Sequence, residues 1–292
     1  MPAQRFGGAH TDRKLEKLEA YLKAFSTALK NQHFRLIFFD AFAGTGGIQI
    51  ADEAPLLEGV SEYASFIEGS AQRALRLGIA FDEYIFVEKS RSKVRQLESL
   101  RVQFPTISDR ISIRCGDANG ELEKFCSQMD WKQTRAVVFL DPFGNQVRWE
   151  TIIAIAETGA IDLWYLFPAG LGVLRQIPKR KGVHETHEAS LDRLLGTREW
   201  RNVFIESTSV DDLFGSRENH ERRATVESIT RFMADRMKTV FRGGVLDEWL
   251  PLGSGNIHMY SLMFAWANPG EKAKLAGKLA QAVLRSSGGG RA

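Results

Sequence analysis

The stretch from Arg35 to Ile48, which reads RLIFFDAFAGTGGI, is the feature that most constrains how this chain can fold. A short apolar run ends there in Asp40, and glycines follow at positions 44, 46 and 47. Such a run predicts a buried strand that stops at a tight turn. Glycine lets a backbone approach a ligand closely, and a helix after the turn would aim its N-terminus at the same point. The stretch therefore indicates either a ligand-binding turn or a plain structural corner.

Strands and helices alternate around this turn. Leucine spacing predicts an amphipathic helix over Thr11 to Lys30 that packs on a sheet. Further strands are expected at residues 83–87, 111–115, 136–140 and 161–167, with helices at 63–77, 90–104, 121–129 and 149–157. Alternation of this kind is typical of a parallel α/β sheet that is covered by helices on both faces.

The alternation stops at Leu171 and returns at Gly244. Residues 171–243 are mostly helical by pattern, so we expect an insertion or cap on the sheet. Residues 244–251 and 257–267 predict a terminal pair of strands, and residues 275–284 predict a helix. The expected organisation is an N-terminal helical segment (1–34), a Rossmann-like core (35–170), a helical substrate cap (171–243), and C-terminal elements that complete the core (244–292).

Composition excludes several classes of protein. The chain has two cysteines, Cys115 and Cys126, which rules out a disulfide framework or a multi-thiolate metal site, and we expect no metal. A net charge of +3 is compatible with a nucleic-acid partner but does not imply one. No run approaches the ~18 apolar residues of a membrane span, and the N-terminus lacks an apolar signal core, so we expect a cytoplasmic protein without membrane contact.

Acidic residues follow four of the predicted strands: Asp40, Glu88, Asp117 and Asp141. Ligands of doubly wound sheets bind across the carboxyl ends of the strands. The acid after the second strand can accept hydrogen bonds from ribose hydroxyls, and the acid after the third can accept one from an adenine amine. The turn lacks the dinucleotide glycine spacing and the Lys-Ser/Thr pair of a phosphate loop. The pattern favours S-adenosylmethionine, which has no phosphate; alternatively, each acid only solvates a loop.

The fourth strand runs into Asp141-Pro142-Phe143-Gly144. Proline cannot continue a central strand, so the backbone leaves the sheet and directs the acid and the aromatic ring outward. A carboxylate that accepts a hydrogen bond from an exocyclic amine can align the nitrogen lone pair with a sulfonium methyl group, while Phe143 stacks on a flipped base. The structural alternative is a rigid strand exit with Phe143 in the core.

Taken together, the motifs DAFAGTGG, FVEKS, GDAN, FLDPFGNQVRW and HMYSLMFAWAN resemble the three-Cys-motif partner (TcmP) family over most of the chain. That family is classed with class I S-adenosylmethionine-dependent methyltransferases, and its name refers to a companion protein with three cysteines. The resemblance implies a Rossmann-like class I methyltransferase sheet, mostly parallel with an antiparallel last strand, and a largely helical insertion after the fifth strand. It also implies the companion as a partner.

The expected cofactor-binding residues, at the motif positions, are Asp40, Phe42, Ala43, Gly44, Thr45, Gly46, Glu88, Lys89, Asp117 and Ala118. The expected catalytic residues are Asp141, Pro142, Phe143 and Gly144. The DPFG motif is also similar to the motif at the same position in tRNA guanine-N2 dimethyltransferases. It departs from the Asp/Asn-Pro-Pro-aromatic motif of adenine and cytosine amino-methyltransferases, because Phe143 stands where a second proline would be.

These observations favour a methyltransferase that modifies an exocyclic amine in a nucleic-acid base, with RNA as the favoured substrate. Arg175, Lys179, Arg180 and Lys181 are candidates for contact with the nucleic acid, although a solvated helix face explains such a run equally well. Two alternatives stay open. One is a partner module that binds the cofactor or nucleic acid without methyl transfer, and the other is a small-molecule methyltransferase.

Overall fold

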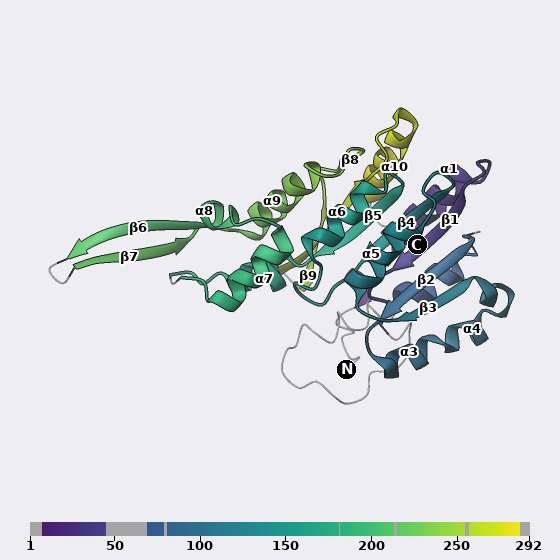
Figure 1. The fold of residues 1–292 in the computed structure, drawn as a ribbon, viewed down its shortest axis with the longest axis horizontal. Helices are drawn as coiled ribbons and strands as arrows, with labels where there is room; N and C mark the ends of the chain where they lie inside the picture. The colour runs from purple at the N-terminus through teal and green to yellow at the C-terminus, as the bar shows by residue number, and fades with distance from the viewer. Residues whose placement is uncertain are drawn as a thin grey trace, which may run out of the picture.

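The computed structural model describes residues 8–44, 69–78, 81–180, 182–212, 215–254 and 257–286. One sheet dominates the described part of the chain, with strand order β3-β2-β1-β4-β5-β10-β8 and with β9 paired to β10 (Figure 1). Its strands are β1 (Arg35–Asp40), β2 (Glu83–Glu88), β3 (Ile111–Cys115), β4 (Thr134–Leu140), β5 (Ile161–Phe167), β8 (Gly244–Val245), β9 (Leu250–Ser254) and β10 (Ile257–Trp266).

The direction of the strands confirms the expected fold class. Strands β1 to β5 are parallel, and β10 runs antiparallel to β5, β8 and β9. A Rossmann-like parallel sheet with an antiparallel C-terminal strand is therefore what this chain forms. The central strands are buried on both faces because helices cover both sides.

Alternate residues of each strand face two separate apolar layers. In β1, Ile37 and Phe39 pack in one layer, and Leu36 and Phe38 pack in the other. The first layer also receives side chains of α5 (Ala118–Gln128), α6 (Trp149–Glu157), α7 (Glu185–Leu195), α8 (Trp200–Phe204) and α9 (Val226–Lys238). The second receives those of α1 (Gly8–Leu29), the helical residues 69–76, α3 (Arg91–Leu97), α4 (Ser99–Gln103) and α10 (Lys274–Arg285).

Two helices differ from the expected ones for local reasons. The helix predicted over residues 90–104 is divided at Glu98, where the Arg101 N–H donates to the Glu98 carbonyl at 3.2 Å and tightens the turn. The helix predicted from residue 121 begins at Ala118, because the Asp117 side chain caps it by accepting a hydrogen bond from the Gly120 N–H. Of the helix predicted over residues 63–77, residues 69–76 are helical, and residues 63–68 lie outside the described residues.

The insertion after β5 corrects one expectation. A π-helical turn (Ala169–Val173) and a 3₁₀ turn (Leu174–Gln176) lead into α7 and α8, but β6 (Ile205–Asp212) and β7 (Gly215–Arg222) then form an antiparallel hairpin before α9. The hairpin extends away from the main sheet (Figure 1) and pairs with none of its strands. The insertion thus combines its helices with a two-stranded hairpin that was not expected. Because β6 and β7 are mostly polar, they lack the apolar alternation by which strands are recognised in sequence.

A buried hydrogen bond joins the N-terminal helix to the sheet. The Tyr21 hydroxyl of α1 donates to Asp162 Oδ2 of β5 at 2.6 Å. Near its middle, α1 is held to the residue that follows α10, because Lys17 Nζ donates to the Ser286 Oγ at 2.8 Å. No helix among the described residues is long and apolar enough to cross a membrane.

Asp162 makes the stability of this fold depend on pH. Burial raises its pKa to about 7, although the hydrogen bond from Tyr21 and the charge of Arg135 act in the opposite direction. Its unfolded pKa is about 4, so the folded state binds more protons than the unfolded state between these values. The free energy of unfolding should fall as the pH rises from about 4 to about 7, by at most about 1.4 kcal/mol per pH unit for this one group.

We expect Asp162→Asn to flatten this pH dependence, because the amide cannot titrate. Urea unfolding at several pH values measures the slope. The matched control is Asp109→Asn, which changes an exposed aspartate and should leave the slope as it is in the unaltered protein. An unchanged slope in Asp162→Asn would show that this carboxyl does not have the raised pKa.

Candidate active site

The carboxyl ends of β1 to β4 lie at one rim of the sheet, because these strands are parallel. Asp40 at the end of β1 is level with Phe86 of β2 and Phe139 of β4, and Glu88 is level with Cys115 of β3. The strand order reverses between β1 and β4, since the chain continues to β2 on one side and from β4 to β5 on the other. Open α/β sheets bind their ligands at such a point.

A cavity of about 560 Å³ opens at this rim, which is the size of a single small-ligand site. The structure brings two predicted sets of residues together in its lining. The predicted cofactor-binding residues that line it are Phe42, Gly44, Glu88, Lys89, Asp117 and Ala118, and the predicted catalytic residues are Asp141 and Phe143.

The structure does not bring Asp40 into the cavity. Asp40 is fully buried behind the turn, where its Oδ1 accepts a hydrogen bond from the Phe42 N–H at 3.1 Å and its Oδ2 accepts one from Ser70 Oγ at 2.7 Å. Burial raises the pKa of Asp40 to about 6, although these two hydrogen bonds act to lower it. The carboxyl group therefore holds the turn after β1 in place and does not contact a ligand directly.

Three other predicted residues also lie outside the cavity lining. Ala43 is fully buried, and its N–H donates to the Val87 carbonyl at 3.0 Å. Pro142 is buried, and Gly144 has a φ of 73°, a left-handed backbone conformation that favours glycine. These residues shape the backbone around the site. The predictions for Thr45 and Gly46 lie outside the described residues.

Glu88 and Asp117 each use one carboxylate oxygen to fix their own loop. Glu88 Oε1 accepts a hydrogen bond from the Ser90 N–H at 2.6 Å, and Asp117 Oδ1 accepts one from the Gly120 N–H at 3.3 Å. In the part of the chain that the structure describes, Glu88 Oε2 and Asp117 Oδ2 have no hydrogen-bond partner. Two acceptors therefore face the cavity from neighbouring strand ends, on side chains that are already oriented.

The loop after β4 presents an acid and an aromatic ring to the same cavity. Asp141 is buried, whereas the Phe143 side chain is 53% exposed. The Phe143 N–H donates to Gln146 Oε1 at 2.9 Å, and the Gln146 N–H donates to the Gly144 carbonyl at 3.0 Å. The expectation that Phe143 lies outward is met, and the alternative that places it in the core is wrong.

Asn119 connects this loop to the end of β3, and sequence reasoning did not single it out. Its Nδ2 donates to the Gln146 carbonyl at 3.0 Å, and its Oδ1 accepts hydrogen bonds from the Arg148 N–H and the Thr151 hydroxyl, both at 2.9 Å. The side chain is buried and also lines the cavity. Asn119 thereby sets the position of the Asp141 loop relative to Asp117.

The insertion contributes one wall of the cavity. Arg193 of α7 is part of the lining, together with Asn145 of the Asp141 loop. Asn145 Nδ2 donates to Gln176 Oε1 at 3.1 Å, so the loop is hydrogen-bonded to the start of the insertion. The insertion and the sheet therefore meet at this site.

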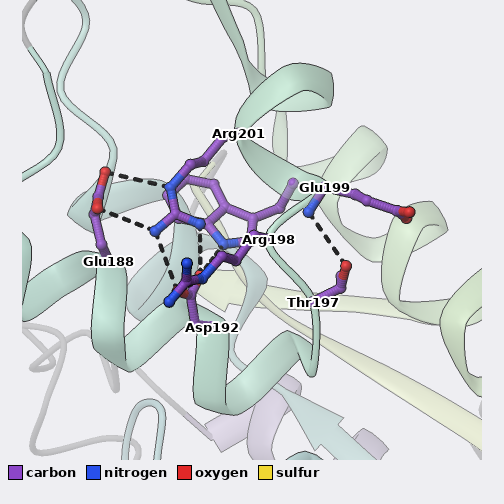
Figure 2. Close-up of polar contacts among 7 residues, drawn as sticks. Glu188, Asp192, Thr197, Arg198, Glu199 and Arg201 are labelled. Atoms are coloured by element: carbon purple, nitrogen blue, oxygen red, sulfur yellow. Dashed lines mark hydrogen bonds and ion pairs between the residues drawn. The ribbon is translucent and has the colours of Figure 1, made fainter.

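An ion-pair network involving Glu188 and Asp192 fixes α7 (Figure 2). Arg201 donates to Asp192 Oδ1 at 2.8 Å and to Glu188 Oε2 at 3.0 Å, and Arg198 pairs with Asp192 at 3.4 Å. Glu188 and Asp192 are four residues apart and lie on the same face of the helix. Arg193, one position later, is turned by about 100° to a different face.

The cations that the sequence suggested for nucleic-acid contact lie elsewhere. Arg175, Lys179 and Arg180 are exposed but do not line the cavity, and Lys181 lies outside the described residues. The lining instead contains Lys89, Lys93, Arg148 and Arg193. Four lining residues that were not predicted stand within the quoted motifs GDAN and FLDPFGNQVRW: Asn119, Asn145, Gln146 and Arg148. Their position in these motifs is a sequence signal that could have identified them. Arg193 has no comparable local signal.

Comparisons with known proteins place this geometry in a broad context. No protein-family model and no curated protein matched the sequence. The resemblance to the three-Cys-motif partner family therefore stays a prediction that rests on its motifs.

Several solved structures are similar to this one at low identity. They include the Legionella pneumophila protein LPL1258 (TM-score 0.48, 11% identity, covering 96% of this chain and 92% of that one). A magnesium protoporphyrin IX methyltransferase from Synechocystis, solved with S-adenosylmethionine bound, has TM-score 0.31 and 14% identity over 77% of this chain and 86% of that one. A putative rRNA methylase from Clostridium thermocellum has TM-score 0.31 and 11% identity over 69% and 97%. The fold assignment itself rests on the strand order and strand directions of this chain.

We expect Asn119→Ala to lower the free energy of unfolding by about 1–3 kcal/mol, because it leaves buried donors on Arg148 and Thr151 with one acceptor fewer. Urea unfolding measures the change. Asn202→Ala, which truncates an exposed asparagine of α8, is the control and should change stability by less than about 0.5 kcal/mol. Equal effects of the two substitutions would refute the connecting role of Asn119.

Proposed function

We propose that this protein transfers a methyl group from S-adenosylmethionine to an exocyclic amine of a nucleic-acid base, with RNA as the favoured substrate. The observation that carries this function is the lining of one cavity by Glu88, Asp117, Asp141 and the exposed ring of Phe143. Glu88 and Asp117 thus offer two oriented carboxylates to a nucleoside. Beside them, Asp141 and Phe143 offer an acid and an aromatic ring to a second planar group.

The chemistry of the cavity fits this cofactor. Glu88 Oε2 can accept hydrogen bonds from ribose hydroxyls, and Asp117 Oδ2 can accept one from an adenine amine. The negative charges of Glu88, Asp117 and Asp141 suit a ligand that carries a sulfonium and an ammonium group. Gly44, whose φ is 61°, closes the turn after β1 beside these groups and brings its backbone to the cavity. When bound here, the cofactor supplies an electrophilic methyl group.

Asp141 and Phe143 would align the acceptor amine. A buried carboxylate that accepts the amine N–H orients the nitrogen lone pair, and the exposed ring of Phe143 stacks on the base that carries the amine. Asp141, which would hold this amine N–H, would accept the proton that the nitrogen loses when it takes the methyl group that the cofactor would supply. The Phe143 N–H donates to Gln146 Oε1, and Asn119 Nδ2 donates to the Gln146 carbonyl; these bonds keep the loop in one geometry, so little reorganisation is needed during transfer.

Action together with a companion three-cysteine protein is part of the same hypothesis, and the motif resemblance is its support. Incubation of the purified protein with radiolabelled S-adenosylmethionine and total cellular RNA or DNA tests the central claim. Transfer of label to RNA is the expected result. Cofactor binding without transfer to either nucleic acid, with or without the companion, would favour a non-catalytic partner module, and transfer to the small-molecule fraction alone would favour a small-molecule methyltransferase.

Removal of the Glu88 carboxylate should weaken cofactor binding. We expect Glu88→Ala to raise the dissociation constant of S-adenosylhomocysteine about 10- to 100-fold, because hydrogen bonds to a charged acceptor are worth about 1.5–3 kcal/mol. Isothermal titration calorimetry measures this constant. Glu98→Ala, at an exposed glutamate outside the cavity, is the control. An unchanged constant in Glu88→Ala would remove Glu88 from the cofactor site.

Removal of the Asp141 carboxylate should instead affect turnover. We expect Asp141→Ala to lower kcat by about 10²-fold or more while the affinity for S-adenosylhomocysteine stays nearly unchanged. Asp141→Asn keeps the shape of this buried side chain and shows whether the loss follows from the charge or from misfolding. Equal losses of turnover and cofactor affinity would contradict the role assigned to Asp141.

A further inference from the structure

More cations line the cavity than the single carboxylate of the proposed cofactor can pair with. Its acids lie at or just after the ends of β2, β3 and β4, and three exposed cations line it as well: Lys89 just after β2, Lys93 in α3, and Arg193 in α7 of the insertion. The fourth cation of the lining, Arg148, is already paired, since its Nη2 lies 2.8 Å from Glu123 Oε1.

The three exposed cations are not neutralised by the protein. Among the residues that the structure describes, none forms a hydrogen bond or an ion pair with the charged group of Lys89, Lys93 or Arg193. S-adenosylmethionine carries a single carboxylate and no phosphate, so it can pair with one of these cations. Lys89, which stands beside the ribose-binding Glu88, is the expected partner. At least two cations are then left for another anion.

Lys93 and Arg193 lie on two elements that are far apart in sequence and face one cavity. Arg193 is presented by a helix whose other faces are both engaged: Glu188 and Asp192 bind Arg201 (Figure 2), and Leu191, Leu194 and Leu195 are buried. The Arg193 side chain therefore projects from a helix whose position is fixed by packing and ion pairs. A guanidinium group recognises phosphate with two parallel hydrogen bonds, and a lysine serves as a point charge for it.

We propose that Lys93 and Arg193 form a phosphate-binding site at the mouth of the cavity, which holds the backbone of a single-stranded RNA while the target base stacks on Phe143. This inference rests on the proposed methyl transfer and identifies the residues that hold the backbone of its RNA substrate. The insertion helix α7 thereby contributes directly to substrate binding, through a residue different from the basic run at residues 175–181. A neutral small-molecule substrate would give these two cations no partner.

Binding of a fluorescently labelled single-stranded RNA of mixed sequence, followed by anisotropy between about 50 and 200 mM salt, tests the site. Each phosphate contact adds about 0.7 to the slope of log K against log salt for a single strand. Lys93→Gln and Arg193→Gln should each lower the slope by about 0.7 and weaken binding about fivefold at 0.1 M salt, and the double variant about 25-fold. Lys272→Gln removes an exposed charge outside the cavity and should change neither quantity.

Calorimetry with S-adenosylhomocysteine on the same variants separates this inference from the proposed function. Its affinity should stay within about twofold of the unaltered protein, because the cations serve the substrate. An unaltered protein that does not bind the RNA, a slope that stays constant in the double variant, or a loss as large in Lys272→Gln would each overturn the phosphate site. A loss of S-adenosylhomocysteine affinity in Lys93→Gln or Arg193→Gln would also overturn it. Failure of the unaltered protein to bind S-adenosylhomocysteine would instead refute the proposed function itself.

Discussion

The parallel register of β1 with β2 and β4 is the constraint on which the rest of the structure depends. It brings the ends of four strands to one rim, so that Glu88, Asp117 and Asp141 lie around one cavity although more than fifty residues separate the first from the last. The register is firmly set because both faces of the sheet are buried. A slip by one residue would exchange Ile37 and Phe39 with Leu36 and Phe38 between two packed layers.

Polar groups at the rim are divided between building the site and facing it. Both carboxylate oxygens of Asp40 accept hydrogen bonds within the protein, one from the turn after β1 and one from Ser70. Glu88 and Asp117 each use one oxygen to fix their own loops. Both the nitrogen and the oxygen of the Asn119 side-chain amide form hydrogen bonds with the loop after β4. Such internal hydrogen bonds orient the remaining acceptors before a ligand arrives, which lowers the entropy that binding has to overcome.

The insertion is joined to the same rim and is not a separate appendage. Asn145 links the Asp141 loop to Gln176, and Arg222 at the base of the hairpin donates to the Ile177 carbonyl at 2.8 Å. The network around Arg201 then holds α7 in the orientation that places Arg193 at the cavity. The strand ends thus supply the acids of the site together with Lys89, and helices α3 and α7 supply Lys93 and Arg193.

The sequence by itself determined the parallel core and the strand-end motifs. Apolar runs bounded by glycine and acidic residues identified β1 to β5 nearly residue by residue, and helix α6 and strand β5 have the predicted bounds. These features are local, because strand burial and chain turns leave their pattern in consecutive residues. The same local logic selected Glu88, Asp117, Asp141 and Phe143, which the structure brings to one cavity.

Only the tertiary structure decided which polar residues face that cavity. Asp40 and Glu88 both end strands, yet one is buried behind a turn and the other lines the cavity, because Ser70 approaches the first from a distant helical segment. Arg193 and Lys93 line the same cavity although 100 residues of chain separate them, and the polar β6–β7 hairpin forms without an apolar pattern. Contacts between segments far apart in sequence fix these features, so no window of consecutive residues contains them.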